Sequence, residues 1–363
     1  MVAPETVTSG PRVSVIVPAR NEEACLGLCL ESLTGQTGVN FEVIVVNDGS
    51  TDRTREIAES FPGVRVVDAE APPPGWAGKT NAMAAGARVA GGEWLLFTDA
   101  DTVHRPGSLA RAVGEAKQHS ASLLSYSPEQ EVFGFWEKAV MPVIFAELAA
   151  TYRPALVSDP RSPAAAANGQ YILVTCEAYD AIGGYAAVSG SLLEDVALAR
   201  AVKASGRKIF FRFGGDAVRT RMYRNFEQLR EGWTKNLALL FPSPVRLAVL
   251  RLTEFGLIAG GLTAAVMALR RSHYVPGLAA AILAATIYAF LLNRIRKAHF
   301  SWEANALSPA GLPLFAYLLL RSRLAYQQGT VRWKGRSYGS STNDARAESA
   351  IIDSPRAAGS HSA

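Results

Sequence analysis

The sequence predicts an α/β domain on a mixed, mainly parallel sheet flanked by helices, followed by transmembrane helices toward the carboxyl end. Short apolar runs alternate with helical segments through the first 120 residues or so, which is the rhythm of parallel strands joined by crossover helices. Hydrophobic residues make up 49% of the 363-residue chain and concentrate after residue 245. We therefore expect a soluble part followed by a membrane part.

Short apolar runs that end at turn residues predict the strands of the sheet. The first four runs cover residues 13–17, 41–46, 64–67 and 93–98, and two later ones cover 171–175 and 208–213. Helical spacing predicts helices over residues 21–33, 51–60, 79–90 and 192–204. Asn21 is the expected N-cap of the first helix.

Residues 132–152 are apolar and aromatic, but charged residues flank or interrupt them and Pro142 lies inside. This pattern predicts a broken helix that lies against the membrane or the domain and does not span the bilayer.

Two later stretches, 255–269 and 274–292, have the length and the near absence of charge of membrane spans. Core helices of a soluble domain are the less favoured alternative. A third stretch, 307–320, contains Pro309 and Pro313 and is either a span or a re-entrant helix. The expected organisation is a disordered tail (1–11), a catalytic domain (12–240), a membrane region with two or three hydrophobic helices (241–325), and a basic juxtamembrane segment with a disordered tail (326–363).

The net charge of +5 arises largely from basic residues beside the apolar segments, where they suit anionic lipid headgroups. Since no nucleic-acid-binding motif is visible, we expect a membrane and no nucleic acid as partner.

Three cysteines form no disulfide framework. The N-terminus carries no leader segment, so we expect a multi-pass protein of the inner or plasma membrane with its first domain in the cytoplasm. The oligomeric state is left open.

Two carboxylates, Asp99 and Asp101, come directly after the apolar run 94–97. Such a pair suits a hard divalent cation that is also bound to a diphosphate, although a solvated turn would look the same. Asp48 ends another strand. It either accepts hydrogen bonds from a base or ribose or belongs to a turn and helix cap.

Gly78-Lys79-Thr80 does not form a phosphate loop, because Pro73 stands where that motif needs glycine. Lys79 can still meet a phosphate at a helix start, or it is an ordinary surface lysine. Glu194 and Asp195 open an apolar helix, where they serve as a general base or compensate the helix dipole. His104 is a metal-site residue or a plain loop histidine.

Taken together, these motifs resemble family 2 glycosyltransferases with the GT-A fold over roughly residues 12–240. The matching stretches are VIVPARNEE at 15–23, VNDGSTD at 46–52, GKTNA at 78–82, DAD at 99–101 and ED at 194–195. With its apolar segments and the basic stretch 329–336, the chain looks like enzymes associated with hopanoid and carotenoid glycosylation. It is more distantly similar to ceramide glucosyltransferases.

The resemblance implies a role for each matching residue. The nucleotide-sugar donor would be bound by Pro18, Arg20, Glu22, Asp48, Lys79 and Asp99, and Trp233 joins the substrate-binding set with a poorer match. Asp101 would bind Mn²⁺ or Mg²⁺ on the diphosphate, and Asp195, with Glu194 beside it, would be the catalytic base. The implied reaction is an inverting transfer of a sugar, with a uridine diphosphate donor favoured, to a hydroxyl of a membrane lipid.

The sequence departs at one motif from the glycosyltransferases that synthesise polymers, and this bears on the choice among the alternative functions. Processive relatives carry Gln-x-x-Arg-Trp, but aligned on Trp233 those positions are Leu229 and Gly232. This favours one or a few transfers over a polysaccharide synthase. A nucleotidyltransferase or a dehydrogenase would need a glycine-rich loop after the first strand, which is absent. An inactive membrane scaffold with a glycosyltransferase-like domain is the non-enzymatic alternative.

Overall fold

The structure is a computed structural model that describes residues 12–333 and 336–338. The predicted tail 1–11 and most of the segment 326–363 lie outside these residues. The chain forms two compact units, one of Met1–Glu131 with Tyr152–Met222 and one of Val132–Thr151 with Tyr223–Ala363. The expected boundary at residue 240 therefore differs from the observed division, because residues 132–151 and 223–240 pack with the hydrophobic helices.

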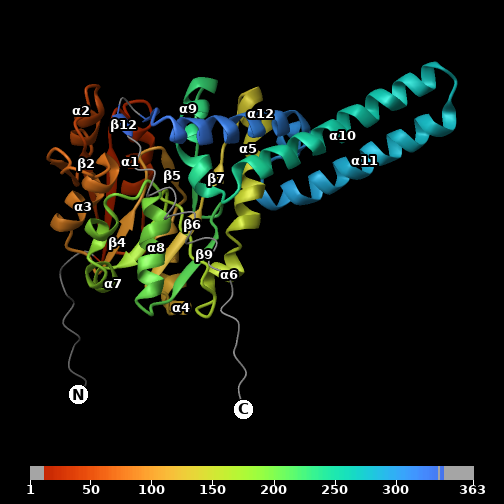
Figure 1. Ribbon diagram of the computed structural model, residues 1–363. Coiled ribbons are helices and arrows are strands. Elements are labelled where there is room, and N and C mark those ends of the chain that lie inside the picture. The colour runs from red at the N-terminus through yellow and green to blue at the C-terminus, as the bar shows by residue number, and fades with distance from the viewer. Residues whose placement is uncertain (1–11, 334–335, 339–363) are drawn as a thin grey trace, which may run out of the picture. The chain divides into compact units, whose positions relative to one another are not determined.

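The first unit is built on a large sheet (Figure 1). It has seven strands in the order β3-β2-β1-β4-β8-β6-β9. All neighbours in it are parallel except β8, which is antiparallel to both β4 and β6. The prediction of a mixed, mainly parallel sheet is thereby confirmed. Its strands are β1 (Val13–Ala19), β2 (Phe41–Asn47), β3 (Val64–Asp68), β4 (Trp94–Phe97), β6 (Leu123–Ser127), β8 (Ile172–Thr175) and β9 (Ile209–Phe213).

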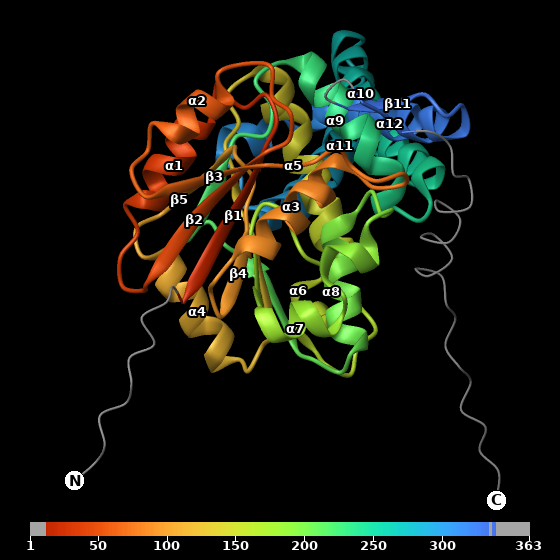
Figure 2. The same ribbon diagram turned by 90° about the vertical axis from the view of Figure 1, so that its left-hand side faces the viewer.

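Helices cover both faces of this sheet (Figure 2). Along β1, Val15 faces a core shared with α1, α2 and α4, whereas Ile16 faces a core shared with α3 and α8, because successive strand side chains point to opposite faces. Both faces are buried, which explains the unbroken apolar runs in the sequence. The helices are α1 (Leu26–Thr34), α2 (Thr54–Glu59), α3 (Gly78–Val89), α4 (Ser108–Gln118), α6 (Pro154–Ser158), α7 (Cys176–Ala181), η1 (Gly184–Val188) and α8 (Glu194–Ala204).

The expectation that Asn21 caps the first helix is wrong. The helix begins at Leu26, and Asn21 lies in the preceding loop with φ of +53°. Its side-chain Oδ1 accepts a hydrogen bond from the backbone N–H of Thr51 at 2.8 Å. Asn tolerates this left-handed conformation, so here it joins two loops of the sheet edge.

A small three-stranded sheet adjoins the end of β4 in the chain. Its order is β5 (Thr102–His104), β10 (Val218–Thr220) and β7 (Glu129–Gln130). Strand β5 follows the Asp99–Asp101 segment directly, and Thr102 pairs with Thr220 of β10. The small sheet therefore fixes the chain that leaves residues 99–101.

The second unit is helical. Its elements are α5 (Phe135–Thr151), α9 (Phe226–Leu240), α10 (Pro244–Arg270), α11 (Tyr274–Ile295), η2 (Arg296–Ala298), α12 (Trp302–Gln327) and a strand pair, β11 (Val331–Trp333) with β12 (Arg336–Tyr338). Helix α5 is continuous, so the expectation of a broken helix is wrong; Pro142 interrupts only one backbone hydrogen bond. Helix α12 is also longer than the predicted stretch 307–320.

Three helices in the described part of the chain are long and apolar enough to cross a membrane. They are Phe135–Ser158, Pro244–Arg270 and Tyr274–Ala298. The last two are mostly uncovered by protein, and α10 and α11 run as a long pair (Figure 1). Helix α12 does not meet the same criteria.

Candidate active site

The site is formed where parallel strands end at one edge of the large sheet. Pro18 of β1 pairs with Val46 of β2, and Ile16 pairs with Phe97 of β4. Asp48 and Asp99, which follow β2 and β4, therefore lie at the same edge. Ligands of open α/β sheets bind at this edge.

The loops after β1 and β2 are tied to each other. Arg20 Nη1 donates to the backbone oxygen of Asp48 at 2.7 Å, and the Asp48 N–H donates to the Ala19 oxygen at 2.9 Å. The backbone N–H of Glu22 donates to Thr54 Oγ1 at 2.7 Å. These bonds give the predicted nucleotide-binding segment a fixed backbone.

Lys79 joins carboxylates from two further elements. Its Nζ, at the start of α3, lies 2.7 Å from Asp99 Oδ1 and 3.3 Å from Glu194 Oε1. Burial lowers the pKa of Lys79, but the charges of Asp99 and Glu194 outweigh burial and hold it well above its usual range. Lys79 is therefore a permanent cation in the site, not the ordinary surface lysine considered above.

Asp195 is held beside this cluster at the start of α8. Its Oδ2 accepts a hydrogen bond from the backbone N–H of Gly169 at 2.9 Å. Burial and the neighbouring charge of Glu194 raise the pKa of Asp195 to about 6, although Lys79 opposes the shift. A carboxylate with this pKa can accept a proton near neutral pH.

Gly169 is a site residue that the sequence reasoning missed. A Cβ at this position would lie 3.2 Å from Lys79 Nζ and 3.5 Å from Asp195 Oδ2. The close approach of backbone to side chains therefore favours glycine. The Asn168-Gly169 pair is a turn signal in the sequence, but nothing there connects it with Asp195.

Buried hydroxyl and imidazole groups hold the turn formed by residues 99–101, here termed the acidic turn. The Thr98 hydroxyl donates to the Gln170 oxygen at 2.8 Å, and the Thr102 hydroxyl donates to the Asp99 oxygen at 2.7 Å. Both hydroxyl hydrogens are thus used, so His104 Nε2, 3.1 Å from Thr98 Oγ1 and 3.2 Å from Thr102 Oγ1, is the donor toward them.

Burial lowers the pKa of His104 to about 3, so the imidazole is neutral at physiological pH. His104 lies in strand β5 and is 3% exposed. It is therefore not the plain loop histidine considered above, and its role is to hold the strand end that carries Asp99.

Asp101 is anchored through its backbone, whose oxygen accepts a hydrogen bond from Thr220 Oγ1 at 3.1 Å. Within residues 12–333 and 336–338, no group of three or more His, Cys, Asp or Glu side chains is placed to hold a metal ion. The chemistry of the donors bears on the metal instead, because Mg²⁺ and Mn²⁺ are commonly bound by one or two carboxylates together with substrate phosphates. The carboxylates of Asp99 and Asp101 after β4 are of this type.

Trp233 belongs to the second unit, unlike the other predicted site residues. It is 2% exposed, its indole N–H donates to Met141 Sδ at 3.3 Å, and its ring meets those of Phe145 and Tyr223 edge-on. Protein atoms therefore cover almost the whole side chain of Trp233. We therefore assign Trp233 a packing role in place of the predicted substrate contact.

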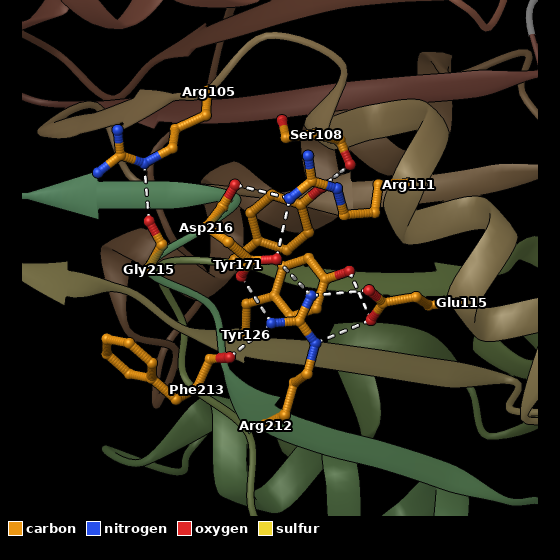
Figure 3. Close-up of polar contacts among 10 residues, drawn as sticks. All are labelled: Arg105, Ser108, Arg111, Glu115, Tyr126, Tyr171, Arg212, Phe213, Gly215 and Asp216. Carbon is orange, nitrogen blue, oxygen red and sulfur yellow. Dashed lines mark hydrogen bonds and ion pairs between the residues drawn. The ribbon is translucent and has the colours of Figure 1, made fainter. Parts of the chain in front are cut away.

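A second charged cluster in the first unit was not predicted (Figure 3). Arg212 of β9 forms ion pairs with Glu115 and Asp216, both at 2.7 Å, and its guanidinium lies 4.3 Å from the ring centre of Tyr126. Arg105 Nε donates to the Gly215 oxygen at 2.7 Å. These contacts hold the turn that leads from β9 to β10, the strand that supports Asp101.

Comparison with known proteins agrees with this geometry. Residues 14–175 match the family described as Glycosyl transferase family 2. Over 338 residues the chain is 31% identical to the 4,4'-diaponeurosporenoate glycosyltransferase of Staphylococcus aureus (strain USA300), covering 90% of this chain and 88% of that protein. The chain therefore belongs to the family 2 glycosyltransferases and is a glycosyltransferase that uses a nucleotide sugar.

A solved structure shows the same fold. The mannosyltransferase PcManGT from Pyrobaculum calidifontis, in complex with GDP-Man and Mn²⁺, matches with a TM-score of 0.52 and 20% identity, over 88% of this chain and 87% of that one. The fold of the chain is the GT-A fold that its sequence motifs implied.

Proposed function

We propose that this protein is an inverting glycosyltransferase that moves a sugar from a nucleoside diphosphate, with uridine diphosphate favoured, to a hydroxyl of a membrane lipid. The acceptor would be of the hopanoid, carotenoid or glycolipid type. The observation that carries the proposal is the cluster of Lys79 with Asp99, Glu194 and Asp195 at the carboxyl edge of the sheet. It supplies a base and a fixed cation within one site.

In this proposal Pro18, Arg20, Glu22 and Asp48 bind the nucleotide, and Asp99 contacts the nucleoside. Lys79, at a helix N-terminus, meets the diphosphate, where the backbone N–H groups also favour negative charge. Its ammonium group is already oriented by Asp99, so little side-chain freedom is lost when the donor binds.

The chemical step is one displacement at the anomeric carbon. Asp195 takes the proton of the acceptor hydroxyl while the hydroxyl oxygen bonds to that carbon, and the bond from the carbon to the diphosphate oxygen breaks. The raised pKa of Asp195 makes it a stronger base than an exposed aspartate. Glu194 contributes by raising that pKa and by sharing Lys79.

Asp101 would hold Mn²⁺ or Mg²⁺ together with the diphosphate. Such an ion supplies positive charge to the leaving group. The Mn²⁺ in the mannosyltransferase structure is consistent with metal use in this fold. The hydroxyl of Thr220 then matters, because it holds the Asp101 backbone.

Two observations support a membrane lipid as the acceptor. One is the set of apolar helices, and the other is the relative from Staphylococcus aureus, which is named a 4,4'-diaponeurosporenoate glycosyltransferase. We propose a multi-pass protein of the inner or plasma membrane with the catalytic unit in the cytoplasm. A polysaccharide synthase remains the second candidate for the same chemistry, and an inactive scaffold is the third.

The test is transfer of labelled sugar in membranes that contain the protein. Labelled UDP-glucose, UDP-N-acetylglucosamine and GDP-mannose are each supplied with Mn²⁺ or Mg²⁺, and label is counted in the organic extract and in insoluble polymer. Label in the extract supports the lipid acceptor and identifies the donor, whereas label only in polymer supports a synthase. No label from any donor, together with no binding of the nucleotides, supports the scaffold.

A further inference from the structure

Chain connectivity decides which of the three apolar helices can cross a membrane. We propose that only the α10–α11 hairpin enters the bilayer, that α5 and α12 stay on the membrane side that holds the catalytic unit, and that four charged residues mark the base of the hairpin. This proposal depends on the part of the proposed function that places the protein in a membrane, and it does not depend on the sugar-transfer reaction.

Helix α5 cannot be a span, because both of its ends lead into the same sheet. Strands β4 and β6 precede α5 in the chain and β8 follows it, yet β8 is hydrogen-bonded to β4 and to β6. A membrane crossing between residues 135 and 151 would put the partners of these ladders on opposite sides. The apolar character of α5 therefore serves its packing among other helices, with Ala139 and Ile144 buried.

Helix α12 is tied to that same side at both ends. Near its start, Glu303 Oε2 accepts from Lys138 Nζ of α5 at 2.9 Å. Near its end, the Tyr326 hydroxyl donates to the backbone oxygen of Lys235 in α9 at 2.7 Å, and α9 leads directly from the first unit.

The middle of α12 also lies directly against α5. A Cβ at Gly311 would be only 1.9 Å from the Ala139 oxygen, so the two helices cross with backbone contact. A helix held in this way at its start, middle and end does not pass through a bilayer.

Helices α10 and α11 differ from α5 in being uncovered over most of their apolar length. Residues 255–269 and 274–292 carry no charged side chain, and large apolar residues such as Leu262, Val275 and Phe290 are exposed along them. The 19 residues of the second stretch extend about 28 Å at 1.5 Å per residue, close to the thickness of a bilayer core. Hydrocarbon is the environment that such a surface requires.

Small residues hold the two helices of the hairpin together. A Cβ on Gly261 would lie 3.0 Å from the Ala284 Cβ, and one on Gly277 would lie 3.3 Å from the Ala268 Cβ. Close backbone approach of this kind stabilises helix pairs in lipid, where apolar side chains gain nothing by leaving their surroundings.

A charge-neutral group of four residues, here termed the ion quartet, lies where the stretch 255–269 begins and the stretch 274–292 ends. It consists of Glu147 from α5, Arg251 and Glu254 from α10, and Arg294 from α11. The Nε atoms of Arg251 and Arg294 lie 3.4 and 3.3 Å from Glu147 Oε1. Arg294 Nη2 lies 2.8 Å from Glu254 Oε2, and Arg251 also pairs with Glu254.

The ion quartet fixes the depth of the hairpin. Ionised groups are costly within the bilayer core, and the quartet member Glu147 belongs to α5, which does not cross. The quartet therefore lies at the membrane surface on the catalytic side, and the loop of Arg270 to His273 reaches the opposite face. An even number of crossings returns α12 to the side of the catalytic unit.

Cysteine labelling in sealed vesicles tests this topology in the full-length protein. Single variants His273→Cys, Trp136→Cys, Ala150→Cys and Gln328→Cys are treated with a membrane-impermeant maleimide in right-side-out and in inverted vesicles. Modified sites are identified by mass spectrometry, so that the native Cys25, Cys29 and Cys176 are told apart from the introduced ones.

We expect His273→Cys to be labelled in one orientation of vesicle and the other three variants only in the opposite one. Labelling of Trp136→Cys and Ala150→Cys from opposite faces would overturn the assignment of α5. Labelling of Gln328→Cys from the same face as His273→Cys would overturn that of α12, and labelling of all four from one face would overturn the crossing hairpin. None of these outcomes depends on transferase activity, so a failed topology and a failed function are distinguishable.

Discussion

The Asp195 carboxylate accepts a hydrogen bond from the Gly169 backbone N–H at 2.9 Å, which joins the start of α8 to the segment before β8. This bond orients the proposed base without neutralising it. Burial and the charge of Glu194 raise the pKa of Asp195, whereas Lys79 and the backbone N–H groups of Val196 and Gly169 lower it.

Transfer should depend on pH through Asp195. Because its pKa is raised to about 6, kcat/KM for the donor at saturating acceptor should fall about tenfold for each pH unit below 6 and level off above it. A pH–rate profile with Asp195→Glu for comparison measures this. A flat profile between pH 5 and 8 would contradict the assignment of Asp195 as the base.

The same shift predicts a gain in stability on removal of the charge. The folded-state pKa of Asp195 is above its unfolded value of 3.8, so folding favours the protonated form. Its stabilising contribution is present below pH 4 and is lost as pH rises through 6. Asp195→Asn should therefore raise the free energy of unfolding at pH 8 by about 1 to 3 kcal/mol, with a smaller gain at pH 5, as measured by thermal melting in detergent. A destabilised variant at pH 8 would contradict the electrostatic account.

Replacement of Lys79 should move the midpoint of the pH–rate profile for transfer to a higher pH. Lys79 lowers the pKa of Asp195 and balances Asp99 and Glu194, so Lys79→Met should move the midpoint above pH 6. It should also raise the donor KM by at least about tenfold, or ~1.4 kcal/mol. Lys117→Met, a change to a lysine of α4, is the matched control, and an unchanged midpoint in Lys79→Met would refute the role of Lys79.

The Thr102 hydroxyl should matter for metal binding. Thr102→Val removes the hydroxyl donor at 2.7 Å from the Asp99 oxygen, which still accepts from the Thr102 N–H at 3.3 Å, so the cost should be about 0.5 to 1.5 kcal/mol. Loosening the acidic turn should weaken Mn²⁺ binding in the presence of nucleoside diphosphate, measured by electron paramagnetic resonance. Thr102→Ser keeps the hydroxyl and should restore the affinity; equal affinities for both variants would show that the bond does not position Asp101.

Charge reversal within the ion quartet should destabilise the helical unit and be partly rescued by the complementary change. Arg294→Glu would place a third carboxylate beside Glu147 and Glu254 and should lower the melting temperature in detergent. Adding Glu254→Arg restores the neutrality of the quartet and the pair between positions 254 and 294, but it sets like charges against Arg251 and Glu147, so it should recover only part of the loss. Additive losses in the double variant would indicate that the quartet is not a coupled unit.

The strands and the acidic edge of the site could be predicted from the sequence, because apolar runs report buried strands and Asp99 and Asp48 directly follow two of them. Gly169 could not, since its importance lies in a close approach to Lys79 and Asp195 across the fold. Asn21 was misassigned because its side chain bonds to Thr51, some thirty residues away, in preference to the adjacent helix.

The sequence predicts a helix over residues 132–152 that does not span the bilayer, because charged residues and Pro142 lie within it, and the proposal drawn from the pairing of β8 with β4 and β6 agrees. The continuity of α5 through Pro142 could not be predicted, because neighbouring helices hold it. The burial of Trp233 likewise follows from the packing of α9 with α5, which a motif alignment does not contain.

The most direct test of the central claim compares Asp195→Asn with the wild-type protein in lipid glycosylation. Both proteins are supplied with the donor that labels wild-type membranes, nucleotide binding is measured in parallel, and Glu56→Gln on the exposed surface of α2 serves as control. We predict that Asp195→Asn binds nucleotide normally but loses organic-extractable label by about 10²- to 10⁴-fold, while Glu56→Gln retains it. Undiminished label in Asp195→Asn would contradict the account.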